Sequence, residues 1–327
     1  MNVLVTGGTG FVGLNVAEAL LARGDRVSIF SNAELPATAR DELDALPGEL
    51  RVVTGDVADG DAVARAMADA APECVVHAAV ITAGEARELA QFDRIVDVNL
   101  KGTAHVVAAA ADCGVRRVVY VSSGSAYGSA LVENDAVDES TPAAPDTLYA
   151  ITKFASERVC ARLRAIRNAD VVCARLGSVF GPWERDTGVR DTLSLPFQIL
   201  ARALSGEPVV LPSREPRRDW IYSRDVAAGI VALLDAPALA HDLYNLSGGR
   251  GWTGFTVRWC ESLKTIYPRF EYRAALTGER PTVAFLGDRD RAPMAVRRLR
   301  EDAGFAARHD AEAAFADYLA WLQRHPL

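Results

Sequence analysis

The 327-residue sequence predicts an α/β fold, a doubly wound parallel sheet with a smaller C-terminal lobe. Over the first 175 residues, short β-branched runs alternate with longer helical patterns. The runs are apolar throughout, which is typical of parallel strands that helices cover on both faces. Beyond Gly181 this alternation stops and Pro, Gly and Arg become frequent, which indicates a second, smaller unit.

The individual elements follow from this alternation. Strands are expected at Val3–Thr6, Arg26–Phe30, Arg51–Gly55, Cys74–His77, Val118–Ser122 and Val171–Arg175. Helices are expected around residues 11–23, 60–70, 91–113 and 147–167. Later, SRDVAAGIVALLDA at 223–236 reads as a helix, and DLYNLSG reads as a strand and turn that rejoin the sheet.

The composition excludes several classes of function. The formal net charge of −7 argues against nucleic acid as the main partner, because phosphate binding needs a basic face. The five cysteines are scattered without a CxxC pair and the five histidines are dispersed, so we expect reduced thiols and no metal site. No apolar run reaches the length of a membrane span and no basic leader precedes the first glycines, so we expect no membrane association and a cytoplasmic location.

A glycine-rich loop follows the first strand, in the stretch VLVTGGTGFVG. Gly7, Gly10 and Gly13 are spaced GxxGxxG, and Phe11 and Val12 open the next helix. Glycine lets the backbone turn sharply and approach a pyrophosphate, while the helix N-terminus offers unpaired N–H groups. In a strand–loop–helix context the loop predicts a Rossmann-type dinucleotide site rather than a plain tight turn. We therefore expect a dinucleotide-binding domain at 1–180, rejoined by about 221–246, and a substrate-binding lobe at 181–220 and 247–327.

Further cofactor residues are expected at the carboxyl ends of the next strands, where such folds bind ligands. The third strand ends in Gly-Asp-Val, and the Asp56 carboxylate can accept a hydrogen bond from an adenine amino group, beside Val57. The fourth ends in His-Ala-Ala, where Ala78 and Ala79 permit a close approach.

The residues after the second strand bear on the choice between NAD and NADP. Ser31 and Asn32 stand where a carboxylate often takes the ribose hydroxyls, and no Lys or Arg occurs from 28 to 39 to pair with a 2′-phosphate. The sequence therefore favours NAD, and NADP stays open.

A Ser, a Tyr and a Lys form a candidate proton-transfer group. Tyr149 and Lys153 lie four apart on an expected helix and so share one face, in a chain with only three lysines. An ammonium group nearby is expected to lower the pKa of the phenol and suit it to acid–base work. Ser123, at the end of the fifth strand, is placed to hydrogen-bond the same substrate oxygen. A turn and a solvated helix face are the alternative interpretation.

The sequence resembles the extended short-chain dehydrogenase/reductase family, in particular its NAD-dependent sugar epimerase/dehydratase branch, over nearly its whole length. The motifs that carry this resemblance are TGGTGFVG, GDV, HAA, VNLKGT, VVYVSSGSAYG, YAITK with Glu157 following, RLGSVFGP, RRDWIYSRDVA and RLREDAGF. The resemblance implies that Tyr149 is the acid/base, that Lys153 contacts the nicotinamide ribose and that Ser123 contacts the reacting hydroxyl. It also implies that Asn99 is a structural member beside the active-site helix, although helix capping alone would explain an Asn there.

The residues after Ser123 narrow the reaction. By this resemblance, dehydratases of the family carry a Thr-Asp-Glu pattern in this strand, and decarboxylases carry a Glu two residues before the Tyr of the Tyr-Gly pair. This chain has Gly124 and Ser125 after Ser123 and so has no carboxylate there. Epimerisation of a nucleotide-linked or related sugar is therefore the leading hypothesis. One-way oxidation of a sugar, sugar acid or other small alcohol is the alternative, and the intact Ser–Tyr–Lys set argues against a non-catalytic NAD(P)-binding sensor or scaffold.

The expected substrate side departs from the family pattern. Ser178 replaces a common Asn, and PSREP at 212–216 replaces a Gly-Asp-Gly turn. Arg218 is the expected anion-binding arginine, with Arg280 from a later loop as a second candidate, and a solvated basic loop is the alternative. The resemblance also implies a homodimer through the helices at 91–113 and 147–167.

Overall fold

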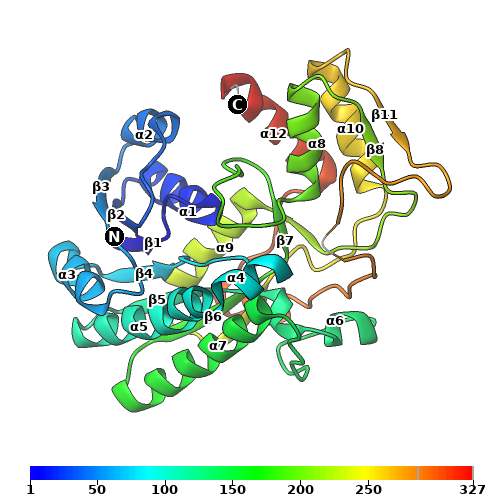
Figure 1. Ribbon diagram of the computed structural model, residues 1–327. Coiled ribbons are helices and arrows are strands. Elements are labelled where there is room, and N and C mark those ends of the chain that lie inside the picture. Colours follow the sequence, from blue (N-terminus) through cyan, green and yellow to red (C-terminus); the bar gives the residue numbers. More distant parts are fainter. Residues whose placement is uncertain (286, 326–327) are drawn as a thin grey trace.

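The computed structural model describes residues 1–285 and 287–325. Within these ranges, seven parallel strands form a central sheet in the order β10-β6-β5-β4-β1-β2-β3 (Figure 1). The strands are β1 Asn2–Thr6, β2 Arg26–Ser31, β3 Glu49–Thr54, β4 Cys74–His77, β5 Arg117–Ser123, β6 Val171–Leu176 and β10 Leu243–Leu246. The order reverses between β1 and β4, and a doubly wound sheet binds its ligands at such a point. The predicted fold class is confirmed.

Helices cover both faces of this sheet (Figure 1). One group of helices that pack on each other consists of α1 Phe11–Ala22, α9 Ser223–Asp235 and α11 Arg297–Ala303. The other consists of α3 Gly60–Ala70, α5 Gly102–Asp112 and α7 Leu148–Arg167, with α4 Glu85–Val96 beside α7. Shorter helices are α2 Ala37–Asp44, the 3₁₀ turn Gly124–Tyr127 and α6 Ala130–Glu133.

The remaining elements gather beyond the carboxyl end of β6 (Figure 1). Two small parallel pairs are formed, β7 Ser178–Phe180 with β9 Trp220–Tyr222, and β8 Val209–Leu211 with β11 Tyr272–Ala274. The helices of this part are α8 Leu195–Leu204, α10 Phe255–Ile266 and α12 Ala311–Arg324.

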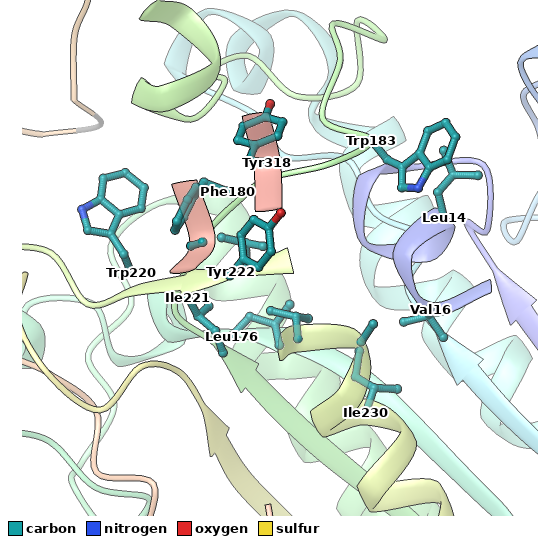
Figure 2. Close-up of a cluster of buried hydrophobic side chains, with 14 of the residues drawn as sticks. Leu14, Val16, Leu176, Phe180, Trp183, Trp220, Ile221, Tyr222, Ile230 and Tyr318 are labelled. Atoms are coloured by element: carbon teal, nitrogen blue, oxygen red, sulfur yellow. The ribbon is translucent and has the colours of Figure 1, made fainter. Parts of the chain in front are cut away.

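One hydrophobic core joins the sheet to these elements. Leu176 ends β6 of the sheet and Ile230 lies on α9, and Phe180 and Tyr318 continue the same buried cluster outward (Figure 2). The rings of Phe180 and Trp220 meet edge to face, with centroids 5.9 Å apart, a favourable aromatic geometry. This core continues from the sheet into the later elements and does not mark a boundary at residue 180. The division into a cofactor-binding domain and a substrate-binding lobe therefore stays a prediction.

The helix predicted at 91–113 is wrong in its extent. The structure has α4 from Glu85 to Val96, a π-helical turn at Asp97–Lys101 and then α5 from Gly102. A π turn inserts a residue into the helical repeat and is frequent at functional sites. In this protein the π-helical turn carries Asn99. The spacing of apolar residues does not reveal such a turn, and the sequence therefore predicted one continuous helix.

The described residues include no helix that is both long enough and apolar enough to cross a membrane.

Candidate functional site

A cavity of about 560 Å³ opens at the carboxyl ends of the sheet strands. Most of the residues predicted for the site line this cavity. From the cofactor prediction these are Gly7, Gly10, Phe11, Val12, Gly13, Ser31, Asn32, Asp56, Val57, Ala78 and Ala79. From the catalytic and substrate predictions they are Ser123, Tyr149, Lys153, Ser178 and Arg218. Asn99 and Arg280 do not line it.

The glycine loop has the geometry that a pyrophosphate needs. Gly7 has φ +66°, and a Cβ added there would lie 2.6 Å from the Ala79 backbone. A Cβ at Gly13 would lie 2.3 Å from the Gly7 carbonyl oxygen, whereas one at Gly10 meets only that oxygen, at 3.2 Å. Gly10 also caps α1 without a side-chain hydrogen bond and without an acidic residue in the first turn. The first N–H groups of α1 are thus available to an anion, so the residues present fit a dinucleotide.

At the expected adenosine end, the side chains of Asp56 and Ser31 already have partners. The Asp56 carboxylate accepts a hydrogen bond from the Ala58 N–H at 2.9 Å and pairs with Arg94 of α4. The Ser31 hydroxyl lies 2.7 Å from that of Thr9. Arg94 lines the cavity but carries no sequence motif, so the sequence did not identify it.

The candidate catalytic hydroxyls come together at the end of β5 and the start of α7. Burial raises the pKa of Tyr149, while hydrogen bonding by Ser123, the charge of Arg190 and hydrogen bonding by Thr82 act in the opposite direction. The prediction that the pKa of Tyr149 is lowered is therefore wrong for this structure, because burial is the larger effect. Thr82 and Arg190 are additions that the sequence did not suggest.

Lys153 lies beneath this group rather than against the phenol. Its ammonium donates a hydrogen bond to the Val121 carbonyl at 2.6 Å and lies 4.7 Å from the centre of the Tyr120 ring. Burial lowers the pKa of Lys153 to about 7, and the negative charge of Glu157 opposes that shift. Lys153 is thus poised between its charged and neutral forms near neutral pH.

A buried ion pair supports Lys153 from the next helical turn. The Glu157 carboxylate accepts hydrogen bonds from Arg175 at 2.8 and 2.6 Å and from the Ser122 hydroxyl at 2.6 Å. The side chains of Glu157 and Arg175 are 1% and 3% exposed. The pair therefore fixes α7 against β5 and β6 directly below the candidate catalytic residues.

Asn99 holds the surrounding backbone and does not face the cavity. Its side chain accepts a hydrogen bond from the Ile81 N–H at 2.8 Å and donates to the Ile81 carbonyl at 3.0 Å and to the Thr152 hydroxyl at 3.2 Å. It thus joins the loop after β4 to α7. This geometry suits a structural member and does not suit contact with a substrate.

The arginines of the expected substrate side differ in their placement. Arg218 is buried, and its guanidinium donates to the carbonyls of Arg217, Arg289 and Gly287 at 3.0, 2.6 and 2.7 Å. Arg280 is exposed and lies outside the cavity lining, so its role as a substrate contact stays a prediction. Arg291 lines the cavity instead, and burial lowers its pKa. The sequence is rich in arginine and has no local motif around these positions, so it does not indicate which of Arg280 and Arg291 lines the cavity.

Comparison with known proteins places the chain among characterised relatives. It is 30% identical to the sterol demethylase protein B of Methylococcus capsulatus, over 82% of this chain and 76% of that protein. It is 28% identical to the dTDP-L-rhamnose 4-epimerase of Burkholderia thailandensis, over 76% of this chain and 77% of that protein. The crystal structure of Thermus thermophilus UDP-glucose 4-epimerase in complex with NAD superposes with a TM-score of 0.80, at 25% identity, and covers 99% of this chain and 100% of that one.

Residues 3–247 match the family described as the NAD dependent epimerase/dehydratase family. This match spans most of the chain and includes the glycine loop, Ser123, Tyr149 and Lys153. The family, the enzyme class and the NAD cofactor predicted from the sequence are confirmed. The chain belongs to the NAD-dependent epimerase/dehydratase family.

Proposed function

We propose that this protein is an NAD-dependent epimerase of a nucleotide-linked or related sugar. The observation that carries the proposal is a single cavity that contains both the glycine loop and the Ser123–Tyr149 hydroxyls. Gly124 and Ser125, which follow Ser123, line the same cavity and bring no carboxylate to assist loss of water. Relatives that carry an epimerase name support the choice.

The residues have distinct proposed roles. NAD bound along the glycine loop would supply the acceptor and donor of hydride. Tyr149 takes the proton from the reacting hydroxyl and returns it, while Ser123 orients that hydroxyl. Lys153 contacts the ribose, and Asn99 holds the loop after β4. We further propose that 1–180 with about 221–246 forms the cofactor unit, and that 181–220 and 247–327 form the substrate lobe.

A one-way dehydrogenase of a sugar, sugar acid or other small alcohol is the second candidate. Two observations favour it. The guanidinium of Arg218 is engaged with the carbonyls of its own loop, and Ser178 stands in place of the Asn expected for a nucleotide diphosphate. The relative named sterol demethylase protein B also shows that the family's names extend beyond nucleotide sugars.

Product analysis together with nicotinamide absorbance separates the two candidates. The protein is incubated with NAD and a panel of UDP- and dTDP-linked sugars, free sugars and sugar acids, and the products are identified by mass spectrometry and chromatography. An epimerase converts one sugar to another with no net change in absorbance, because the hydride returns. A dehydrogenase accumulates reduced cofactor in step with product, and that result would replace the epimerase proposal.

The cofactor preference gives a first prediction. Calorimetry should show that the protein binds NAD(H) more tightly than NADP(H), because no Lys or Arg occurs between 28 and 39 and Glu34 would repel a 2′-phosphate. A preference for NADPH would contradict this interpretation. Replacing Asn32 with Arg should reduce the difference in affinity between NAD(H) and NADP(H), because it adds a positive charge at the cavity wall that can pair with a 2′-phosphate.

A homodimer gives a second prediction. Large apolar side chains are exposed on two neighbouring helices, Leu89 and Phe92 on α4 and Ile151 on α7, at 83%, 56% and 46%. The family resemblance implies a dimer through such helices. We expect light scattering to show a dimer, and we expect Phe92→Glu to shift it to a monomer because a charge would be buried.

A matched control uses Leu276, an exposed leucine near β11 that is 72% exposed. Leu276→Glu should leave the dimer intact. A wild-type monomer at working concentration would contradict the proposal.

We also propose a cytoplasmic location. The cysteines are all free thiols, which supports this location.

A further inference from the structure

The segment 182–194 connects β7 to α8 and forms one wall of the cavity. Its backbone pairs with the loop after β4. The Thr82 N–H donates to the Val189 carbonyl at 3.0 Å, and the Asp191 N–H donates to the Thr82 carbonyl at 3.1 Å. Residue 190 is thereby held beside Thr82, whose hydroxyl hydrogen-bonds Tyr149.

The side chain of Arg190 is anchored on one side and open on the other. Its Nη1 donates to the Glu184 carboxylate at 2.8 Å. That carboxylate is only 1% exposed and also accepts hydrogen bonds from the N–H and hydroxyl of Ser194, so its position is fixed. Among the described residues, the Nε and Nη2 groups of Arg190 have no hydrogen-bond partner, although the side chain lines the cavity and is 31% exposed.

The charged and titratable groups around Tyr149 come from several elements. From α4, the Glu88 carboxylate accepts a hydrogen bond from the Leu148 N–H at 2.9 Å, at the backbone of the first turn of α7. Lys153, one turn along α7, directs its ammonium to the Val121 carbonyl, and the phenol of Tyr120 lies on β5. Arg190 is the cation whose charge favours the phenolate form of Tyr149 against the effect of burial.

We propose that Arg190, held in place by Glu184, is a positioning residue that sets the protonation of Tyr149 and thereby the pH range of proton transfer. The inference rests on the proposed role of Tyr149 as the acid/base. A guanidinium stays protonated at every working pH, so its stabilisation of a phenolate does not fade as pH rises. Lys153 cannot offer the same constancy, since burial brings its pKa to about 7.

The test does not depend on knowing the substrate. The protein is labelled with 3-fluorotyrosine, whose phenol ionises at lower pH than tyrosine, and the ¹⁹F resonances are titrated. The Tyr149 resonance is the one that disappears in Tyr149→Phe. Arg190→Gln should raise the titration midpoint of Tyr149 by about one pH unit, the low end of the effect of a nearby opposite charge. Arg190→Lys keeps the positive charge, so its midpoint should lie close to that of the wild type.

Arg185→Gln is the matched control, because Arg185 lies on the same segment but donates to the Thr9 carbonyl. It should shift the Tyr149 midpoint much less than Arg190→Gln does. An unchanged midpoint in Arg190→Gln, or an equal shift in both variants, would overturn the proposal.

The pH profile of kcat/KM then tests the functional consequence. In the oxidative direction, the ionisation that limits Arg190→Gln should move to higher pH by the same amount. The kcat/KM of Arg190→Gln should therefore be about tenfold below that of the wild type near neutral pH and should recover at high pH. A loss that is equal at every pH would mean a structural role and would reject the proposal. A wild-type protein that turns over no substrate while the ¹⁹F shift is present would count against the proposed function alone.

Discussion

Replacing Tyr149 with Phe is expected to lower turnover by about 10² to 10⁴, the usual contribution of general acid–base catalysis. The change removes only the phenolic hydroxyl, which is hydrogen-bonded with Ser123 and Thr82 at the head of α7. The ring and the glycine loop stay in place, so calorimetry should show nearly unchanged NAD binding. Steady-state turnover on the substrate found by product analysis gives the measurement.

A second tyrosine provides the control for this experiment. Tyr267 follows α10 and does not line the cavity. Tyr267→Phe should therefore leave both turnover and NAD binding close to wild type. Near-normal turnover in Tyr149→Phe would reject the proposed mechanism, whereas a parallel loss of NAD binding would mean that the hydroxyl has a structural role.

The cofactor side of the cavity could be predicted from the sequence because its determinants are local. Gly7 is favoured by its φ of +66° and Gly13 by the close approach of the Gly7 carbonyl oxygen, and both requirements lie within one turn, so they leave a readable spacing. Tyr149 and Lys153 share a helix face, so their proximity also follows from spacing. The strands were predictable for the same reason, since each is a short apolar run.

Arg190 and Arg291, which also line the cavity, could not be predicted from the sequence, because they reach it only through the tertiary fold. Arg190 reaches the cavity because the segment after β7 pairs with Thr82, more than one hundred residues earlier in the chain. The backbone of Arg291 donates to the Arg217 carbonyl, a contact between two loops without periodicity. The pKa of Tyr149 was mispredicted for a related reason, since spacing reports a neighbouring ammonium but does not report burial.

The ion pair beneath the site underlies the second large effect. We expect Arg175→Met to lower the free energy of unfolding by about 3–5 kcal/mol, the usual cost of removing one partner of a buried pair. Glu157 would then keep its charge in a place where it is 1% exposed, and among the described residues the Ser122 hydroxyl would be its remaining hydrogen-bond donor. Urea denaturation followed by circular dichroism measures the change.

An exposed pair on neighbouring strands is the matched control. Arg26 and Glu49 lie 2.7 Å apart with side chains 61% and 74% exposed. Arg26→Met should cost less than about 1 kcal/mol, because water already solvates both charges. If Arg175→Met costs no more than Arg26→Met, the buried pair does not stabilise the fold as we infer.

Combining Glu157→Leu with Arg175→Met should recover most of the lost stability, since no unpaired charge then remains buried. It should not recover activity. The Glu157 carboxylate opposes the lowering of the Lys153 pKa, so its removal should drive that pKa further below about 7 and leave the lysine neutral at working pH. A stable double variant with weakened NAD binding or turnover would therefore show that the pair serves Lys153 as well as the fold. Full activity in that variant would restrict the pair to stability.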